Sequence, residues 1–113
     1  MDDIVNYQTD GLGPSIDINA MRLAAESASN LMKVLANSDR LLLLCHLTQH
    51  EKSVGELENL TGIKQPSLSQ QLSVLRESKL VSTRRESKNI YYQLASTSAM
   101  KVLQVLYQEY CSK

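Results

Sequence analysis

Apolar side chains recur at steps of three and four residues along two stretches near the ends of the chain, residues 18–36 and 98–112. This spacing is typical of a helix with one apolar face, so both stretches are predicted to be helical. The run 41–47, LLLLCHL, is apolar nearly all round and predicts a helix that lies inside the domain. Ser38 is placed to cap that helix, and Asp39 favours its first turn.

A shorter helix is predicted over residues 54–60, followed by a tight turn. Ser53 and Glu56 have the spacing of a capping box, in which each side chain accepts a hydrogen bond from the backbone N–H of the other. Gly62 can take the left-handed conformation that closes a helix. The turn is therefore expected to lead directly into the next helix.

That next helix is predicted to run from Pro66 to about Glu77. Gln65 occupies a cap position, and Pro66 takes the first helical position, where its missing N–H costs nothing. The side opposite the core carries serine and glutamine instead of the Lys and Glu that are usual on a solvated helix. The side expected to face the core carries Leu68, Leu72 and Leu75.

After Leu80 the apolar period falls to two, which predicts two β-strands, residues 81–86 and 90–94, joined by residues 87–89. Asn89 is the turn residue expected to tolerate a positive φ. A short helix, a glycine turn, a second helix and a hairpin follow one another in order. The predicted fold is therefore mainly α with a small β-hairpin, a winged helix-turn-helix.

Length and composition add a domain organisation. The chain has 113 residues, of which 42% are hydrophobic, enough for one compact core. Residues 1–17 lack periodicity and are predicted to be a flexible arm, leaving residues 18–113 as one domain. A run of about 18 apolar residues would be needed to span a membrane, and none occurs. The acidic N-terminus does not resemble a signal peptide, so a cytoplasmic location is expected.

The formal net charge of zero hides a segregation of charge along the chain. Residues 1–63 have a net charge of −5, whereas residues 64–89 hold six basic and two acidic side chains, a net charge of +4. The predicted second helix and hairpin thus coincide with one cationic segment, which favours a polyanionic partner.

The uncharged polar face of the second helix fits a role in reading DNA. Glutamine can form two hydrogen bonds with adenine, serine can donate to or accept from bases and phosphates, and basic hairpins contact phosphates or a minor groove. Each feature alone would equally suit a solvated surface or a protected strand edge, but their order favours DNA binding. The expected contacts are Lys64, Gln65, Ser67, Ser69, Gln70, Arg76, Arg84, Arg85, Lys88 and Asn89.

Several motifs in residues 30–112 occur together in one known family. They are LANSDRL (35–41), SVGEL (53–57), QPSLSQQL (65–72), LRE (75–77), LV (80–81), RR (84–85) and YYQL (91–94). With them the chain resembles the ArsR/SmtB family of bacterial winged-helix repressors. The resemblance implies a homodimer through the first and last helices, an operator that is an imperfect inverted repeat of double-stranded DNA, and repression until an inducer arrives. Two apolar stripes at the ends of the domain agree with a partner surface of this kind.

The positions at which metal-sensing members of that family carry ligands hold other residues in this chain. Residues 53–57 contain no cysteine, and residues 98–112 contain no Asp or His and a single Glu, Glu109. Neither a metal site nor a cofactor is therefore expected.

The only two cysteines, Cys45 and Cys111, are either buried apolar residues or reactive thiols. Their positions, with SVGEL, QPSLSQQL and the final YC, are similar to the BigR/SqrR-type persulfide-responsive repressors. That resemblance implies an inducer of the persulfide or reactive sulfur class, a disulfide or polysulfide bridge between the second and last helices, and release of DNA. Burial is expected to raise the pKa of Cys45, and the end of a helix disfavours a thiolate at Cys111.

Three other functions remain open at this point. A metal or metalloid sensor could use both cysteines with His46 and His50, which share a helix face. An activator that displaces a silencer from DNA would make the same DNA contacts. A protein-interaction module would bind no DNA at all. An enzyme is not expected, because no C-x-x-C, glycine-rich phosphate loop or nucleophile elbow occurs.

Overall fold

The computed structural model describes residues 17–112. The predicted N-terminal arm lies outside the described residues except for Asp17, so its boundary stays a prediction. Contacts divide the chain into two units, residues 1–30 and 31–113. Helix α2 begins in the first unit, and all other described elements belong to the second. None of the helices in the described part is long and apolar enough to cross a membrane.

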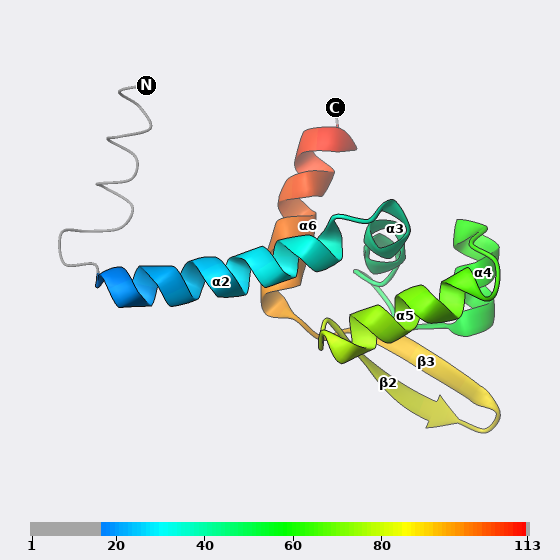
Figure 1. The fold of residues 1–113 in the computed structure, drawn as a ribbon. Helices are drawn as coiled ribbons and strands as arrows, with labels where there is room; N and C mark the ends of the chain where they lie inside the picture. Colours follow the sequence, from blue (N-terminus) through cyan, green and yellow to red (C-terminus); the bar gives the residue numbers. More distant parts are fainter. Residues whose placement is uncertain (1–16, 113) are drawn as a thin grey trace. The chain divides into compact units, whose positions relative to one another are not determined.

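The order of elements confirms a mainly helical winged helix-turn-helix (Figure 1). Helices α4 and α5 form the helix-turn-helix, and strands β2 and β3 form the hairpin, or wing. In chain order the elements are α2 (Ile18–Leu35), α3 (Ser38–His46), β1 (Lys52–Ser53), α4 (Val54–Thr61), α5 (Ser67–Glu77), β2 (Val81–Glu86), β3 (Asn89–Leu94) and α6 (Thr97–Tyr110).

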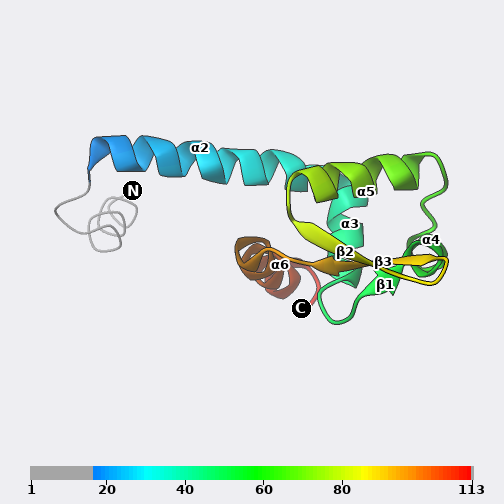
Figure 2. The same ribbon diagram turned by 90° about the horizontal axis from the view of Figure 1, so that it is seen from below.

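The wing belongs to a three-stranded antiparallel sheet in the order β1-β3-β2, whereas the sequence predicted only two strands (Figure 2). Strand β1 is two residues long, with Lys52 opposite Tyr92 and Ser53 opposite Tyr91. Two residues are too few to show the alternation of apolar and polar side chains, so the sequence did not predict β1. The sheet ties the wing to the residues just before α4.

Leucines of α3, α4 and α5 form the centre of the core, and Leu35, Val81, Ala99 and Leu103 add to it from α2, β2 and α6. Leu43, Leu57 and Leu72 are at most 1% exposed, and the leucines predicted to anchor α5 are all buried. The prediction that α3 lies inside the domain holds for one side only: Leu43 and Leu44 are fully buried, whereas Leu42 is 41% exposed and Cys45 is also exposed. Helix α3 therefore buries one side against α4 and α5 and leaves the other accessible.

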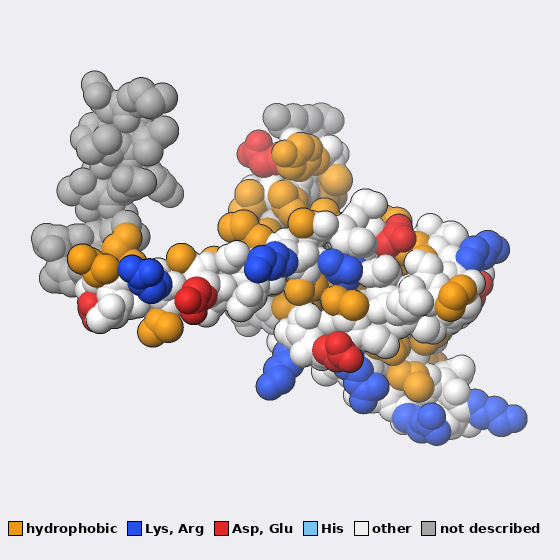
Figure 3. Space-filling view, in the orientation of Figure 1, with side chains coloured by type: hydrophobic (Ala, Val, Ile, Leu, Met, Phe, Trp, Pro, Cys, Tyr) orange, Lys and Arg blue, Asp and Glu red, His pale blue; other side chains and the backbone are white. Residues whose placement is uncertain are grey.

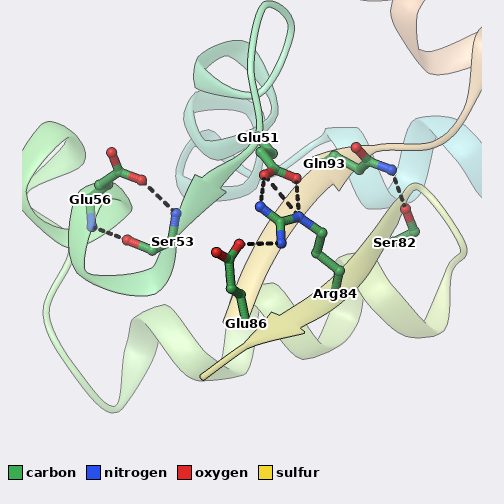
Figure 4. Close-up of polar contacts among 7 residues, drawn as sticks. All are labelled: Glu51, Ser53, Glu56, Ser82, Arg84, Glu86 and Gln93. Atoms are coloured by element: carbon green, nitrogen blue, oxygen red, sulfur yellow. Dashed lines mark hydrogen bonds and ion pairs between the residues drawn. The ribbon is translucent and has the colours of Figure 1, made fainter. Parts of the chain in front are cut away.

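The ends of the helices follow local hydrogen bonds. Helix α3 is capped by Asn37, whose side chain accepts from the Arg40 N–H, and not by Ser38 as predicted. The capping box of α4 is confirmed: the Ser53 N–H donates to Glu56 at 2.8 Å, and the Glu56 N–H donates to Ser53 at 3.1 Å (Figure 4). Gly62, with φ 74°, closes α4 in the left-handed conformation, as predicted.

Two predicted turn details are corrected. Pro66 is the residue before α5 instead of its first helical residue. Asn89 begins β3 and pairs with Glu86, so the turn consists of two residues, and the positive φ of 60° falls on Ser87. A two-residue hairpin turn commonly needs a positive φ at its first position, which is Ser87 here.

Candidate DNA-binding surface and cysteine pair

Helix α5 is held by its leucines so that its first turn remains accessible. Leu68, Leu72 and Leu75 are buried, and α5 packs against α3 and β2. The tight turn at Gly62 sets the direction of the chain as it enters α5. Of the predicted contacts on this helix and just before it, Ser67 is half-buried, and four residues are exposed: Lys64, Gln65, Ser69 and Gln70.

Gln65 caps α5 from outside the helix. Its side-chain oxygen accepts hydrogen bonds from the backbone N–H of Ser69 at 3.0 Å and from the Ser69 hydroxyl at 2.7 Å. A backbone N–H can only donate, so the Gln65 oxygen is occupied and its NH₂ group is left for a ligand. The Gln70 side chain makes no hydrogen bond within residues 17–112, and both of its functions remain available.

The two neighbouring arginines of the wing have different surroundings, and Figure 4 shows those of Arg84. Arg84 Nε lies 2.9 Å from each carboxylate oxygen of Glu51, and its guanidinium also bonds Glu86 at 2.7 Å. The same guanidinium lies 4.6 Å from the centre of the Tyr91 ring. Hydrogen bonding to Arg84 lowers the pKa of Glu51, and hydrogen bonding to Glu51 raises the pKa of Arg84.

Arg85 is exposed and has no ion pair within the part of the chain that the structure describes. Alternate residues of a strand point to opposite faces, so Arg84 and Arg85 serve different sides of the wing. Arg85 is thus the better placed of the two to reach a phosphate without first losing a partner.

The other predicted DNA contacts lie at the ends of these elements. Lys88 is in the turn, Asn89 starts β3, and Arg76 is in the last turn of α5, all of them exposed. Figure 3 shows Lys and Arg side chains gathered around the wing and few acidic ones beside them. The cationic segment of the sequence, residues 64–89, therefore forms a positively charged wing and the adjacent first turn of α5.

The cysteines are both accessible free thiols. Cys45 lies in the last turns of α3, and Cys111 follows the last residue of α6 as its cap. The pKa of Cys45 is raised, first by its partial burial and then by the negative charge of Cys111 when that thiol ionises. The expected rise in the pKa of Cys45 on burial is confirmed.

A metal site does not emerge around them. Within residues 17–112 no three His, Cys, Asp or Glu side chains are grouped so that they could hold an ion. His46 is half-buried at the end of α3, and His50 is exposed beyond it. A site with both histidines and both cysteines, the alternative that the sequence left open, has no support in this geometry.

Two further polar residues belong to this surface although the sequence did not indicate them. Glu51 holds Arg84, 33 residues away, and Gln71 accepts a hydrogen bond from Arg40, 31 residues away. Both partners are distant along the chain. The sequence shows that Glu51 is charged and that Gln71 is next to Gln70, but neither fact indicates which residue each would bind.

Comparison with known proteins establishes the family. The pattern of the family described as "Bacterial regulatory protein, arsR family" matches residues 37–83. The chain is 44% identical over 110 residues to the biofilm growth-associated repressor of Xylella fastidiosa, covering 97% of this chain and 96% of that protein. The chain belongs to the ArsR family. The chain is therefore a DNA-binding transcriptional regulator. Its helix-turn-helix and wing indicate the same function independently.

Solved structures agree with an ArsR fold. The crystal structure of the transcriptional repressor BigR from Xylella fastidiosa matches with a TM-score of 0.79 at 45% identity, over 87% of this chain and all of that one. A homodimeric winged helix-turn-helix DNA-binding domain from Mycobacterium bovis matches with a TM-score of 0.68 at 28% identity, over 86% and 88%. The transcriptional activator HlyU of Vibrio cholerae is 37% identical over 99 residues, covering 88% of this chain and 92% of that protein.

Proposed function

We propose that this ArsR-family protein is a homodimeric repressor that binds an inverted-repeat operator and releases it when Cys45 and Cys111 become joined by sulfur. Operator contacts come from the first turn of α5 and from the wing. The observation that carries the sensing step is the pair of exposed free thiols, one in α3 and one at the end of α6. Similarity to the named repressors supports the direction of regulation.

A dimer is proposed because α6 and the end of α2 leave apolar side chains uncovered. On α6, Val105 is 57% exposed, Tyr107 60% and Tyr110 80%, and Met32 of α2 is 62% exposed. Figure 3 shows this apolar surface along α6. Burying such side chains stabilises a complex, and a two-fold interface can use the same surface twice. The homodimeric relative supports this arrangement.

The sensing chemistry is an exchange of sulfur between thiols. The Cys45 thiolate attacks the terminal sulfur of a persulfide RSSH, forming Cys45–SSH and releasing RS⁻. The Cys111 thiolate then attacks the inner sulfur, forming the disulfide and releasing HS⁻. Two thiols and one RSSH thus yield a disulfide, RSH and H₂S. If a second RSSH first converts Cys111 to Cys111–SSH and releases RSH, one persulfide then attacks the inner sulfur of the other, which releases H₂S and gives a trisulfide bridge.

The bridge joins α3 to the end of α6. Helix α3 packs against α4 and α5, so a displacement of α3 changes the support of the operator-binding helix. Release requires the bridged state to bind the operator less well than the reduced state. If α6 lies in the dimer interface, the bridge also affects the spacing of the two α5 helices.

The experiment compares the wild type with Cys45→Ser and Cys111→Ser. A duplex selected from random DNA by the reduced protein serves as the operator, and glutathione persulfide serves as the inducer. We expect all three reduced proteins to bind alike and only the wild type to release DNA. Mass spectrometry should find the two thiols of the wild type joined, with a loss of two hydrogen atoms and any added sulfur. Normal release by either variant would refute the dithiol mechanism.

A second candidate is activation, which the similarity to the transcriptional activator HlyU supports, and for which we propose displacement of a silencer as the mechanism. The DNA contacts would be the same in both functions. The position of the operator distinguishes them: a site that overlaps the core promoter indicates repression, whereas an upstream site within a silenced region indicates activation. Transcription measured with and without the protein decides between them.

A further inference from the structure

The side chain of Arg40 connects three helices. From the first turns of α3, its Nε donates to the carbonyl oxygen of Val34 at 2.7 Å, and a terminal nitrogen donates to that of Lys33 at 3.4 Å. The other terminal nitrogen donates to the Gln71 side-chain oxygen at 2.8 Å. Val34 and Lys33 belong to the end of α2, and Gln71 belongs to α5.

The bonds to α2 have a clear physical cause. The last four carbonyl groups of a helix lack partners within it and carry the negative end of the helix dipole. A guanidinium placed there satisfies two of these groups with charge-assisted hydrogen bonds. Arg40 is itself fixed at its backbone, because its N–H donates to the Asn37 cap at 3.0 Å. The guanidinium therefore has little freedom to move independently of α2 and α3.

The bond to α5 reaches the operator-binding helix at an informative place. Gln71 is half-buried and lies between Gln70, which is exposed, and Leu72, which is buried. Three different nitrogens of the Arg40 guanidinium are engaged with the protein, and the Arg40 side chain is itself half-buried. This arrangement suits a residue that orients α5, and it does not suit a residue that binds a phosphate.

We infer that Arg40 is a positioning residue for operator binding, which sets the orientation of α5 relative to the end of α2 and relative to α3. Helix α3 also carries Cys45, so the same hydrogen bonds transmit a displacement of α3 to Gln71 and its neighbour Gln70. This inference rests on the proposed function of the surface. It assigns Gln71 a supporting role and leaves base reading to the residues on the exposed side of α5.

The test begins with operator affinity of the reduced full-length chain. We expect Arg40→Met and Gln71→Met each to weaken binding about tenfold, the usual scale for losing a hydrogen bond to a charged group. The double variant should bind no more weakly than Arg40→Met alone, because both substitutions remove the same contact to α5. Gln71→Glu keeps an acceptor for Arg40 and should stay within about threefold of the wild type.

Salt dependence separates positioning from direct contact. Removing a phosphate contact reduces the slope of log affinity against log salt concentration by about 0.9 for each contact, hence by about 1.8 when both copies of the dimer lose one. Arg85→Ala is the matched comparison and should show that reduction. Arg40→Met should weaken binding without changing the slope. Urea unfolding of each variant checks that the protein remains folded, and the Gln71 variants continue the test if Arg40→Met does not fold.

The effect of glutathione persulfide completes the test. Gln71→Met should show a smaller fold-change in operator affinity on treatment than the wild type does, although its thiols still become joined. The inference is overturned if Gln71→Met binds and responds as the wild type does, or if Arg40→Met reduces the salt slope as Arg85→Ala does. A wild type that binds DNA but ignores persulfide would refute the proposed sensing alone, and the affinity and salt measurements would still decide the role of Arg40.

Discussion

At the scale of single residues, reactivity and charge depend on immediate surroundings more than on residue type. Cys45 is an accessible thiol whose pKa is nevertheless raised by partial burial and by Cys111. Only the thiolate attacks a persulfide. A raised pKa leaves a smaller thiolate fraction at neutral pH, so the structure favours slow reaction there and faster reaction as the pH increases.

We therefore predict the pH dependence of Cys45 alkylation by iodoacetamide, followed by mass spectrometry of the peptide. An ordinary thiol, with a pKa of about 8.5, approaches its maximum rate above that pH. The rate at Cys45 should still be rising steeply there. Cys111→Ser removes one of the two causes and should move the profile to lower pH. A plateau of the wild-type rate below about pH 8.5 would contradict the raised pKa.

At the scale of helices and strands, much of the fold could be predicted because the deciding contacts are local. The capping box at Ser53 and Glu56, the left-handed Gly62 and the buried face of α5 depend on residues within one or two turns. Strand β1 could not be predicted, because its two residues are strand only by pairing with β3. The bond from Arg40 to Gln71 and the bonds from Arg84 to Glu51 were missed for the same reason, as these partners lie more than 30 residues apart.

The two glycines of this region allow a paired stability test on α4. Gly55 lies within the helix, and a Cβ atom there would meet nothing within 4 Å, so Gly55→Ala should stabilise the protein by about 0.5–1 kcal/mol. Gly62 has equally free space but a φ of 74°, so Gly62→Ala should cost about 1 kcal/mol or more.

Urea denaturation of both variants measures this difference. Gly62→Asn serves as the control, because asparagine accepts the left-handed conformation better than alanine does. It should lose less stability than Gly62→Ala. Equal and small effects at both glycines would show that the conformation of Gly62 does not limit stability.

At the scale of the whole molecule, the proposed activity needs two copies of the chain. The exposed apolar side chains of α6 would be costly in a monomer, and an inverted-repeat operator matches a protein with two-fold symmetry. Assembly and DNA binding are thereby linked, since each copy supplies one α5 helix and one wing.

We predict that Tyr107→Glu weakens dimerisation by at least about 100-fold, because a carboxylate in an apolar interface loses its hydration. Sedimentation equilibrium measures the dissociation constant of the dimer. Gln108→Glu adds the same charge at a polar position of α6 and should have a small effect. A monomeric wild type, or equal effects of the two variants, would contradict dimerisation through this face of α6.

Ser53 takes part in two structural interactions: it pairs with Tyr91 across the sheet, and it caps α4. Strand β1, which pairs with the wing, and helix α4 consequently depend on one residue and cannot be exchanged separately. A chimera intended to transplant the wing from a relative must take its segment from before Lys52 onward. Cutting at Val81 instead would pair the hairpin of the relative with β1 of this chain, and a mismatch there would disturb Ser53, which caps α4.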